Sequence, residues 1–183
     1  MPDNKHQSLP SLPMEKWYVF YTKSRSEKKA LAQLTHQGYH AFVPIVKTIK
    51  QWSDRKKKVL DPLLPGFIFV KLEENQIREV LKHPLIVACL KIKNIPGIVS
   101  DKEMEQMKLV ANNWSEAYEK VSQEEIFEIG EWVEVTTGTL YGIAGNLVMH
   151  RGKHKVCLEV AALNTKFIIE VPKSHLKKIN KAA

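Results

Sequence analysis

The fold is decided by the stretch Pro62-Leu63-Leu64-Pro65-Gly66-Phe67-Ile68-Phe69-Val70, a proline-bounded turn that leads into a hydrophobic segment. Proline presets φ and glycine accepts positive φ, so the Pro-Gly pair predicts a tight turn. Successive side chains of a strand point to opposite faces, so Phe67 and Phe69 should share one face and Ile68 the other. The stretch therefore predicts a turn and a strand, one face of which is core.

The residues before this stretch predict a strand, a helix and a hairpin. Residues 16–23 alternate and are rich in aromatics, which is typical of a strand. Ser24-Arg25-Ser26-Glu27 has capping-box spacing and should open a helix that Gly38 stops. Residues 41–49 predict a second strand. The polar, basic residues 50–60 are expected at an exposed hairpin tip.

The residues after this stretch complete one domain. A short helix over residues 75–82 should end before His83-Pro84, and residues 85–92 predict another strand. Ser100-Asp101-Lys102-Glu103 is a second capping box. It opens a helix with an apolar stripe: Met104, Met107, Ala111, Trp114, Tyr118 and Val121. The order β-α-β-β-α-β-α predicts an α+β domain whose helices cover one face of the sheet.

The last fifty residues predict a small all-β domain of the SH3-like barrel type. Short strand patterns cover residues 132–136, 142–150, 155–161 and 166–171, with Arg151-Gly152 as a turn. Gly138, Gly142 and Gly145 precede this turn and permit a tight backbone path with positive φ. Residues 156–163 would also fit a helix in isolation, but the β-branched residues favour the barrel.

Charge is segregated along the chain, whose net charge is +8. Residues 16–60 hold eleven Lys or Arg and two acids, residues 101–134 hold ten acids and three bases, and the remainder is basic again. This distribution favours a nucleic acid near the basic parts, although charge runs are also common on solvated surfaces. With no apolar run near about 20 residues, we expect a cytoplasmic protein without membrane contact.

Three elements, in this order and spacing, resemble the NusG family of transcription elongation factors. They are Trp17-Tyr18-Val19-Phe20-Tyr21-Thr22, Leu64-Pro65-Gly66-Phe67-Ile68-Phe69 and Gly138-Thr139-Leu140-Tyr141-Gly142-Ile143-Ala144-Gly145. The resemblance implies a flexible tail over residues 1–14 and an NGN-type polymerase-binding domain over 15–121. A linker over 122–128 and a KOW barrel over 129–183, with Gly138, Gly142 and Gly145 in its loop, should follow.

The resemblance also implies the surface that binds RNA polymerase. In the family an apolar concavity receives the clamp helices of the largest polymerase subunit. The matching residues of this chain are Trp17, Leu64, Pro65, Phe67 and Phe69. A helix that docks on aromatic anchors is a common mode of recognition.

A basic surface is the candidate site for non-template or upstream DNA. Resemblance to specialised paralogs implies such a site on the first helix, and the charge of the hairpin adds a second basic part that would contact upstream DNA or the polymerase. The residues are Lys23, Arg25, Lys29, Gln33, Gln37, Arg55, Lys56, Lys57 and Lys58. Lysines attract phosphates without reading sequence, whereas Gln and Arg can also contact bases. The alternative is a solubilising surface. The turn at His83-Pro84-Leu85 has a leucine where the family usually has glycine, which leaves its geometry open.

No catalytic constellation is recognisable. The histidine pairs flank turns and lack the i, i+4 helical spacing of a metal site, and Cys89 and Cys157 have no CxxC partner. We therefore expect no enzyme, no cofactor, no metal and a monomer.

The function expected is an elongation or antitermination factor that suppresses pausing and promotes read-through. A specialised, operon-specific paralog of the RfaH or UpxY type is preferred. One alternative is the housekeeping factor, whose KOW domain contacts Rho or a ribosomal protein, with Phe167, Ile168 and Ile169 as a candidate patch. Another alternative is an RNA-binding KOW module of the ribosomal or translational type.

Overall fold

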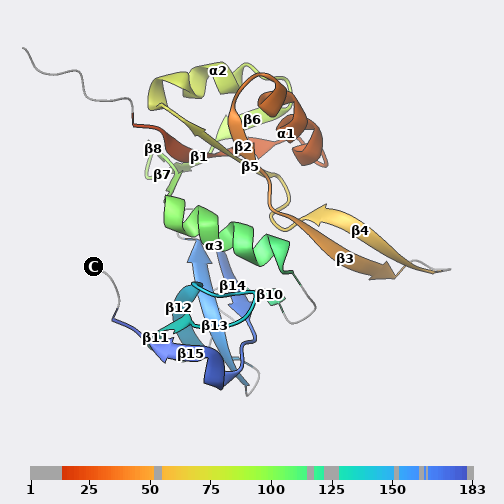
Figure 1. Ribbon diagram of the computed structural model, residues 1–183. Coiled ribbons are helices and arrows are strands. Elements are labelled where there is room, and N and C mark those ends of the chain that lie inside the picture. Colours follow the sequence, from red (N-terminus) through yellow and green to blue (C-terminus); the bar gives the residue numbers. More distant parts are fainter. Residues whose placement is uncertain are drawn as a thin grey trace, which may run out of the picture.

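The computed structural model describes residues 14–51, 55–114, 118–121, 128–150, 153–160, 163 and 165–180. An N-terminal unit with helices on a sheet is followed by an all-β C-terminal unit (Figure 1). The expected fold class, α+β and then a small all-β domain, is confirmed. Within the described residues, no helix is long and apolar enough to cross a membrane.

The N-terminal sheet is antiparallel and has the strand order β2-β5-β1-β6, with β9 also paired to β1. Its strands are β1 (Lys16–Thr22), β2 (His40–Phe42), β5 (Phe67–Leu72), β6 (Ile86–Cys89) and β9 (Ile98–Val99). Two separate hairpins extend from it: β3 (Ile45–Gln51) with β4 (Lys56–Pro62), and β7 (Lys91–Ile92) with β8 (Ile95–Pro96). The predicted strand over 41–49 is thus divided around Pro44, which has no N–H for a ladder.

Helices cover both faces of this sheet, so the expectation of one covered face was wrong. On one face, α1 (Glu27–His36) and α2 (Ile77–Leu81), preceded by the 3₁₀ turn η1 (Glu74–Gln76), pack on Phe20 and Ile68. On the other face, α3 (Asp101–Asn112) packs on Val19 and Phe69. Figure 1 shows α1 and α2 above the sheet and α3 below it. The apolar stripe of α3 packs on the second face of the sheet, because α1 and α2 already cover the first face.

The start of α1 also differs from expectation. Its N-cap is Ser26, without a side-chain cap bond, so the capping box of Ser24 and Glu27 does not form. Glu27 instead accepts a hydrogen bond from the backbone N–H of Gly66, at 2.7 Å. The stop at Gly38 is confirmed: α1 ends at His36 and Gly38 has φ of +89°.

The helix α3 begins as predicted and ends earlier. Ser100 Oγ accepts from the N–H of Glu103 at 3.2 Å, while Glu103 Oε2 accepts from the N–H of Ser100 at 2.8 Å. The helix ends at Asn112, so the predicted continuation through Val121 was wrong. Residues 118–121 form β10 (Tyr118–Val121), which pairs with β14. The expected linker at 122–128 stays a prediction; residues 122–127 lie outside the described part.

The C-terminal sheet is antiparallel with the order β10-β14-β13-β12-β11-β15. Its further strands are β11 (Glu128–Val135), β12 (Ala144–His150), β13 (Lys153–Val160), β14 (Thr165–Ile169) and β15 (Leu176–Lys178), the last preceded by the 3₁₀ turn η4 (Lys173–His175). Residues 153–160 are therefore a strand and not a helix. The predicted turn Arg151-Gly152 lies outside the described residues.

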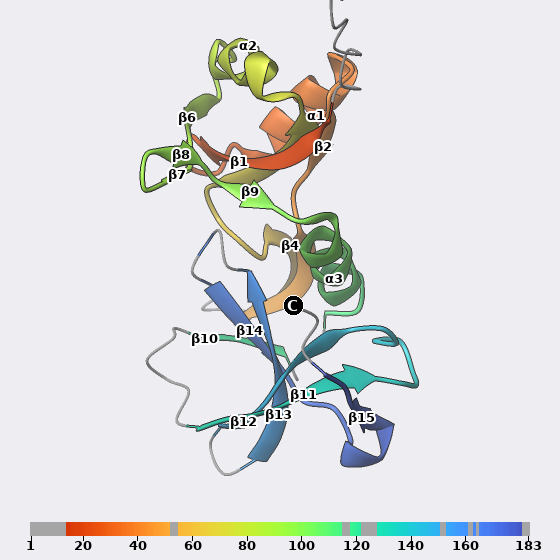
Figure 2. The same cartoon turned by 90° about the vertical axis from the view of Figure 1, so that its left-hand side faces the viewer.

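The two units share one apolar core. A single cluster of buried residues joins Phe69 and Met107 of the N-terminal unit to Val133, Leu158 and other residues of the C-terminal sheet. Figure 2 shows α3 between the N-terminal sheet and the C-terminal strands. A buried hydrogen bond from Gln106 Nε2 to the carbonyl oxygen of Ala144, at 3.2 Å, also links the units.

Candidate functional site

The aromatic face is our name for the side of β1 and β5 formed by Trp17, Leu64, Phe67 and Phe69, with Phe42 of β2. The register of β1 and β5 places Tyr21 opposite Phe67 and Val19 opposite Phe69. Because these positions alternate with Phe20 and Ile68, the predicted segregation of Phe67 and Phe69 from Ile68 is confirmed. The structure thus brings Trp17, Leu64, Phe67 and Phe69 of the predicted polymerase surface into one cluster, to which Pro65 does not belong.

Accessibility divides this face into an inner and an outer part. Trp17, Leu64 and Phe69 are buried, with exposed fractions of 3%, 1% and 0%. Phe67 is partly buried and Pro65 is exposed. Only the outer part is therefore accessible in this arrangement of the two units.

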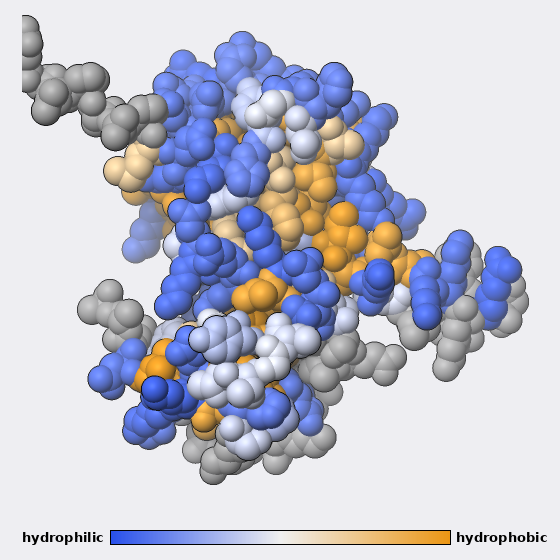
Figure 3. All heavy atoms as spheres, in the orientation of Figure 1, coloured by the Kyte–Doolittle hydropathy of each residue, from blue (hydrophilic) through white to orange (hydrophobic). Residues whose placement is uncertain are grey.

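Tyr21 extends the outer part and was missed in the sequence. Tyr21 is 37% exposed, and its ring centroid lies 5.1 Å from that of Phe67. Leu60, on β4, is 51% exposed, but it pairs with Lys47 and lies on the opposite side of the hairpin from Val46, which belongs to the cluster of the aromatic face. Figure 3 shows apolar surface at the foot of the β3–β4 hairpin, beside the N-terminal unit. The sequence does contain a signal for Tyr21: Trp17, Val19 and Tyr21 alternate along β1, and alternate residues of a strand share a face.

Trp17 is held at the inner edge by polar groups. Its indole Nε1 donates to Asp101 Oδ1 at 2.9 Å, and Lys71 Nζ donates to the same oxygen at 2.8 Å. Lys108 Nζ lies 5.2 Å from the centroid of the Trp17 ring, a cation–π distance. The hydrogen bonds from Lys71 and, to a smaller extent, from Trp17 hold the pKa of Asp101 below its usual value. Trp17 therefore fastens the start of α3 to the sheet.

The Pro65-Gly66 turn precedes the aromatic strand, as expected. Gly66 has φ of +83°, which favours glycine. Its carbonyl oxygen accepts from the N–H of Thr22 at 2.8 Å, and its N–H donates to Glu27 at 2.7 Å. The turn is therefore bound to both the end of β1 and the start of α1.

The helical part of the predicted nucleic-acid surface is exposed. Its members are Lys23, Arg25, Lys29, Gln33 and Gln37. Arg25 adopts φ of +56°, in a turn where the N–H of Ser26 donates to the carbonyl oxygen of Lys23. Lys29 and Gln33 lie on α1, which packs on the face of the sheet opposite to the aromatic face.

A hollow with a volume of about 400 Å³ borders this surface. It is lined by Ala32, Gln33, His36, Gln37, His83 and Pro84. His83 is only 6% exposed, and its Nδ1 accepts from the N–H of Leu85 at 3.2 Å. Leu85 is not among the described residues with positive φ, so its replacement of glycine costs no backbone strain. The part played by His83 and Pro84 in this hollow was not predicted.

The hairpin part of the surface is also exposed. Arg55, Lys57 and Lys58 are exposed at the start of β4. Residues 50–60 were expected at a hairpin tip, but β3 extends to Gln51 and β4 begins at Lys56, so most of them form paired strands. The side chain of Lys56 lies outside the described ones. Lys28 Nζ donates to the carbonyl oxygen of Leu60, which ties the hairpin to α1.

The predicted glycine loop connects β11 and β12. Gly138 and Gly142 have φ of +84° and +85°. Gly145 serves a different purpose, since a Cβ there would lie 2.2 Å from the carbonyl oxygen of Cys157 on β13. Tyr141 is 68% exposed at the loop tip. The alternative patch of Phe167, Ile168 and Ile169 is contradicted, because all three are 0% exposed in the sheet.

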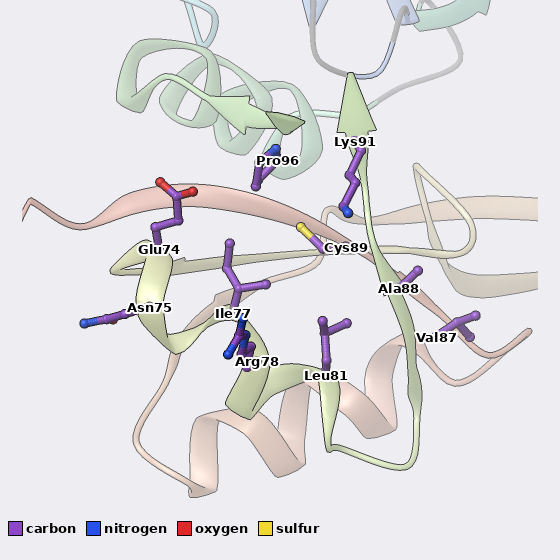
Figure 4. Close-up of a pocket in the computed structure, with 10 residues that line it drawn as sticks. All are labelled: Glu74, Asn75, Ile77, Arg78, Leu81, Val87, Ala88, Cys89, Lys91 and Pro96. Atoms are coloured by element: carbon purple, nitrogen blue, oxygen red, sulfur yellow. The ribbon is translucent and has the colours of Figure 1, made fainter. Parts of the chain in front are cut away.

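A groove of about 800 Å³ lies between α2, β6 and the β7–β8 hairpin and contains none of the predicted site residues. Figure 4 shows Ile77 and Leu81 on α2 across from Ala88 and Cys89 on β6. Burial raises the pKa of the Cys89 thiol. Within the described residues, no group of three His, Cys, Asp or Glu side chains is arranged to hold a metal.

The comparison with family models identifies the family of this chain. A family model described as transcription termination factor nusG matches residues 15–108. The chain belongs to the NusG family. The matched range covers the N-terminal unit from β1 to α3 and so includes the aromatic face and the helical part of the nucleic-acid surface.

The relatives found are distant in sequence. The transcription termination/antitermination protein NusG of Rickettsia conorii is 22% identical over 177 residues, which cover 90% of this chain and 91% of that protein. The protein of the same name from Rickettsia prowazekii is 21% identical with the same coverage. NusG-family proteins are transcription factors and not enzymes.

Two solved structures are similar over most of the chain. "Domain interaction in Thermotoga maritima NusG" has 22% identity and a TM-score of 0.47, and covers 91% of this chain and 98% of its own. "Crystal Structure of MjSpt4:Spt5 complex conformation B" has 18% identity and a TM-score of 0.32, and covers 91% and 99%.

Proposed function

We propose that this NusG-family chain is an operon-specific antitermination factor that docks on RNA polymerase through its aromatic face. The observation that carries this proposal is the gathering of Trp17, Leu64, Phe67 and Phe69 on one side of β1 and β5. Aromatic anchors in an apolar groove are typical receptors for an amphipathic helix, and the clamp helices of the polymerase fit that description.

Docking begins at the outer part of the face. Tyr21 and Phe67 offer apolar surface without any rearrangement. Phe69 offers none, so a clamp helix reaches the inner part only after α3 or the C-terminal unit moves away. The bound factor then favours the processive state of the polymerase by binding it preferentially, which is a shift of populations.

The second contact of the proposal is with the displaced non-template strand or upstream DNA. Lys23 and Lys29 supply attraction to phosphates, which weakens with salt and does not depend on sequence. Gln33 and Gln37 border the hollow with His83, and amide groups there are suited to hydrogen bonds with a base. Arg55, Lys57 and Lys58 extend the same basic surface along the hairpin.

The RNA-module alternative is weaker. It gives no role to the N-terminal unit, whose residues 15–108 match the family model. A contact of the C-terminal unit with Rho or a ribosomal protein stays a prediction. Tyr141 is the exposed aromatic in that unit on which to test it.

The experiment is single-round transcription through a terminator by purified bacterial RNA polymerase. We expect the wild type to raise read-through. The Phe67→Ala variant should need about a tenfold higher concentration for the same read-through, because it lacks an interface anchor. Tyr141→Ala removes an exposed aromatic from the other unit and is the matched control. Equal read-through with all three proteins, or none with any, contradicts polymerase docking through this face.

The DNA contact is tested separately on assembled elongation complexes. Lys23→Ala and Lys29→Ala should each weaken binding on every sequence and reduce the dependence of log Kd on log salt by about one. Gln33→Ala and Gln37→Ala should instead alter the preference among sequences. A salt dependence that no variant changes would contradict the contact.

A further inference from the structure

Glu27 is a buried carboxylate whose partner is far away in the sequence. It is 5% exposed, and carboxylates are rarely buried without a hydrogen bond that compensates the lost water. Its Oε1 accepts from the backbone N–H of Gly66 at 2.7 Å, across 39 residues of sequence. A bond of this length to a charged acceptor is among the stronger hydrogen bonds of proteins.

The local alternative for Glu27 is left unused. Glu103 is the third residue of α3 and closes a capping box with the N-cap residue Ser100. Glu27 has that spacing from Ser24, but the N-cap of α1 is Ser26, so Glu27 is the first residue of the helix, whose start has no side-chain cap bond. The carboxylate therefore serves the Pro65-Gly66 turn rather than its own helix end, where the positive end of the helix dipole also stabilises it.

The first turn of α1 fixes two elements of the N-terminal unit. Glu27 holds the turn from which Phe67 enters the aromatic face. Its neighbour Lys28 donates to the carbonyl oxygen of Leu60, on the hairpin. Lys29 of this turn is exposed, as are Lys23 and Arg25 just before the helix, and these three are the cations of the helical part of the nucleic-acid surface.

We propose that Glu27 is a positioning residue that couples the nucleic-acid surface of α1 to the Pro65-Gly66 turn of the aromatic face. A strand that binds Lys23 and Lys29 shifts the first turn of α1. The Glu27–Gly66 hydrogen bond passes this shift to Phe67, and polymerase docking affects α1 by the same bond, because coupling is reciprocal. This inference rests on the proposed function.

The first test needs no polymerase. The full chain, labelled with ¹⁵N, is titrated with a single-stranded DNA of about 12 nucleotides, the size of a typical strand-binding site. We expect the amide signal of Gly66 to shift together with those of Lys23 and Lys29, while Gly142 in the C-terminal unit stays constant. A Gly66 signal that stays constant while Lys29 shifts overturns the proposal, as does the absence of any shift.

Two variants separate positioning from mere stability. Glu27→Ala should abolish the response of Gly66 while Lys29 still responds. Glu27→Gln keeps an Oε1 acceptor and should restore it. Gln76→Ala is the matched control, since it removes a side-chain oxygen that accepts the N–H of Glu73 at a different helix start, at 3.0 Å. An unchanged Gly66 response in Glu27→Ala overturns the proposal.

The second test compares polymerase elongation complexes with and without the non-template strand. The wild type should bind the strand-containing complex more tightly than the other complex. In Glu27→Ala the ratio of the two affinities should be about tenfold smaller, the size expected for a charged hydrogen bond. If Glu27→Ala loses the same factor of affinity on both complexes, the coupling is overturned. If the wild type binds neither complex while Gly66 still responds to DNA, the proposed docking fails and the coupling stands.

Discussion

The two faces of the N-terminal sheet follow the same alternation of side chains and are closed in different ways. Phe20 and Ile68 pack only against α1, α2 and neighbours of their own unit. Val19 and Phe69 pack in a cluster that continues through α3 into the C-terminal sheet. The first face is therefore buried within its own unit, whereas the second belongs to a core that the two units share. Side chains that are equally buried on the two faces would thus not be equally exposed if the units separated.

The largest effect is expected from truncation of one phenylalanine on each face. Phe20→Ala and Phe69→Ala should each lower the free energy of unfolding by about 3–5 kcal/mol, because both rings are fully buried. Phe69→Ala should in addition increase amide hydrogen exchange in β13 and β14, which Phe20→Ala should not. Urea unfolding and exchange mass spectrometry measure the two effects. Identical exchange patterns in both variants would remove the distinction between the faces.

The next effect concerns the bond between the units. Gln106→Ala leaves the carbonyl oxygen of Ala144 without its buried donor, which should cost about 1–3 kcal/mol. Limited proteolysis should then cut between residues 114 and 128 faster than in the wild type. Asn113→Ala, which removes a side-chain bond to the carbonyl oxygen of Leu109 at the end of α3, is the control. Unchanged cleavage would show that this bond does not hold the units together.

A smaller effect is expected at the two thiols. Burial raises the pKa of Cys157 to about 11, and burial also raises that of Cys89, which is less deeply buried. Cys89 should thus react faster with a thiol reagent at pH 8. The stability that neutral Cys157 contributes is present below the ordinary thiol pKa and is lost as the pH rises towards about 11. Equal labelling rates in the native protein would contradict this difference.

The smallest effect is expected at Asp101, which is solvent-exposed. Its pKa is lowered by the bonds from Lys71 and Trp17, so its contribution to stability is present above the ordinary aspartate pKa, near about 4. This contribution is lost as the pH falls through the lowered pKa. Asp101→Asn should therefore reduce Tm slightly at pH 7 and by less at pH 2. A reduction of the same size at both values would contradict an electrostatic origin.

Local patterns in the sequence predicted what depends on local geometry. The alternation of Phe67, Ile68 and Phe69 is confirmed because a strand leaves each side chain only two directions. The box of Ser100 and Glu103 is confirmed because its two partners are three residues apart. The positive φ at Gly138 and Gly142 follows from the residue type.

Apart from the strand divided at Pro44, the wrong predictions involve a distant partner. The spacing of Trp114, Tyr118 and Val121 fits a helix, but β14 offers residues 118–121 a strand to pair with. Glu27 has the spacing of a cap, but Gly66 is the partner that it finds. The burial of Phe167 and Ile169 depends on the other unit as well as on their own sheet. Sequence spacing does not report such competition.

The shared core makes the two units one cooperative block. Because a single cluster of side chains runs from β1 to β14, calorimetry should record one melting transition rather than one for each unit. A partner that binds only the separated form must supply the free energy of parting that cluster. Its apparent affinity is the intrinsic affinity reduced by the fraction of molecules already open. The free energy that holds the two units together therefore sets the concentration of such a partner at which half of the protein is bound.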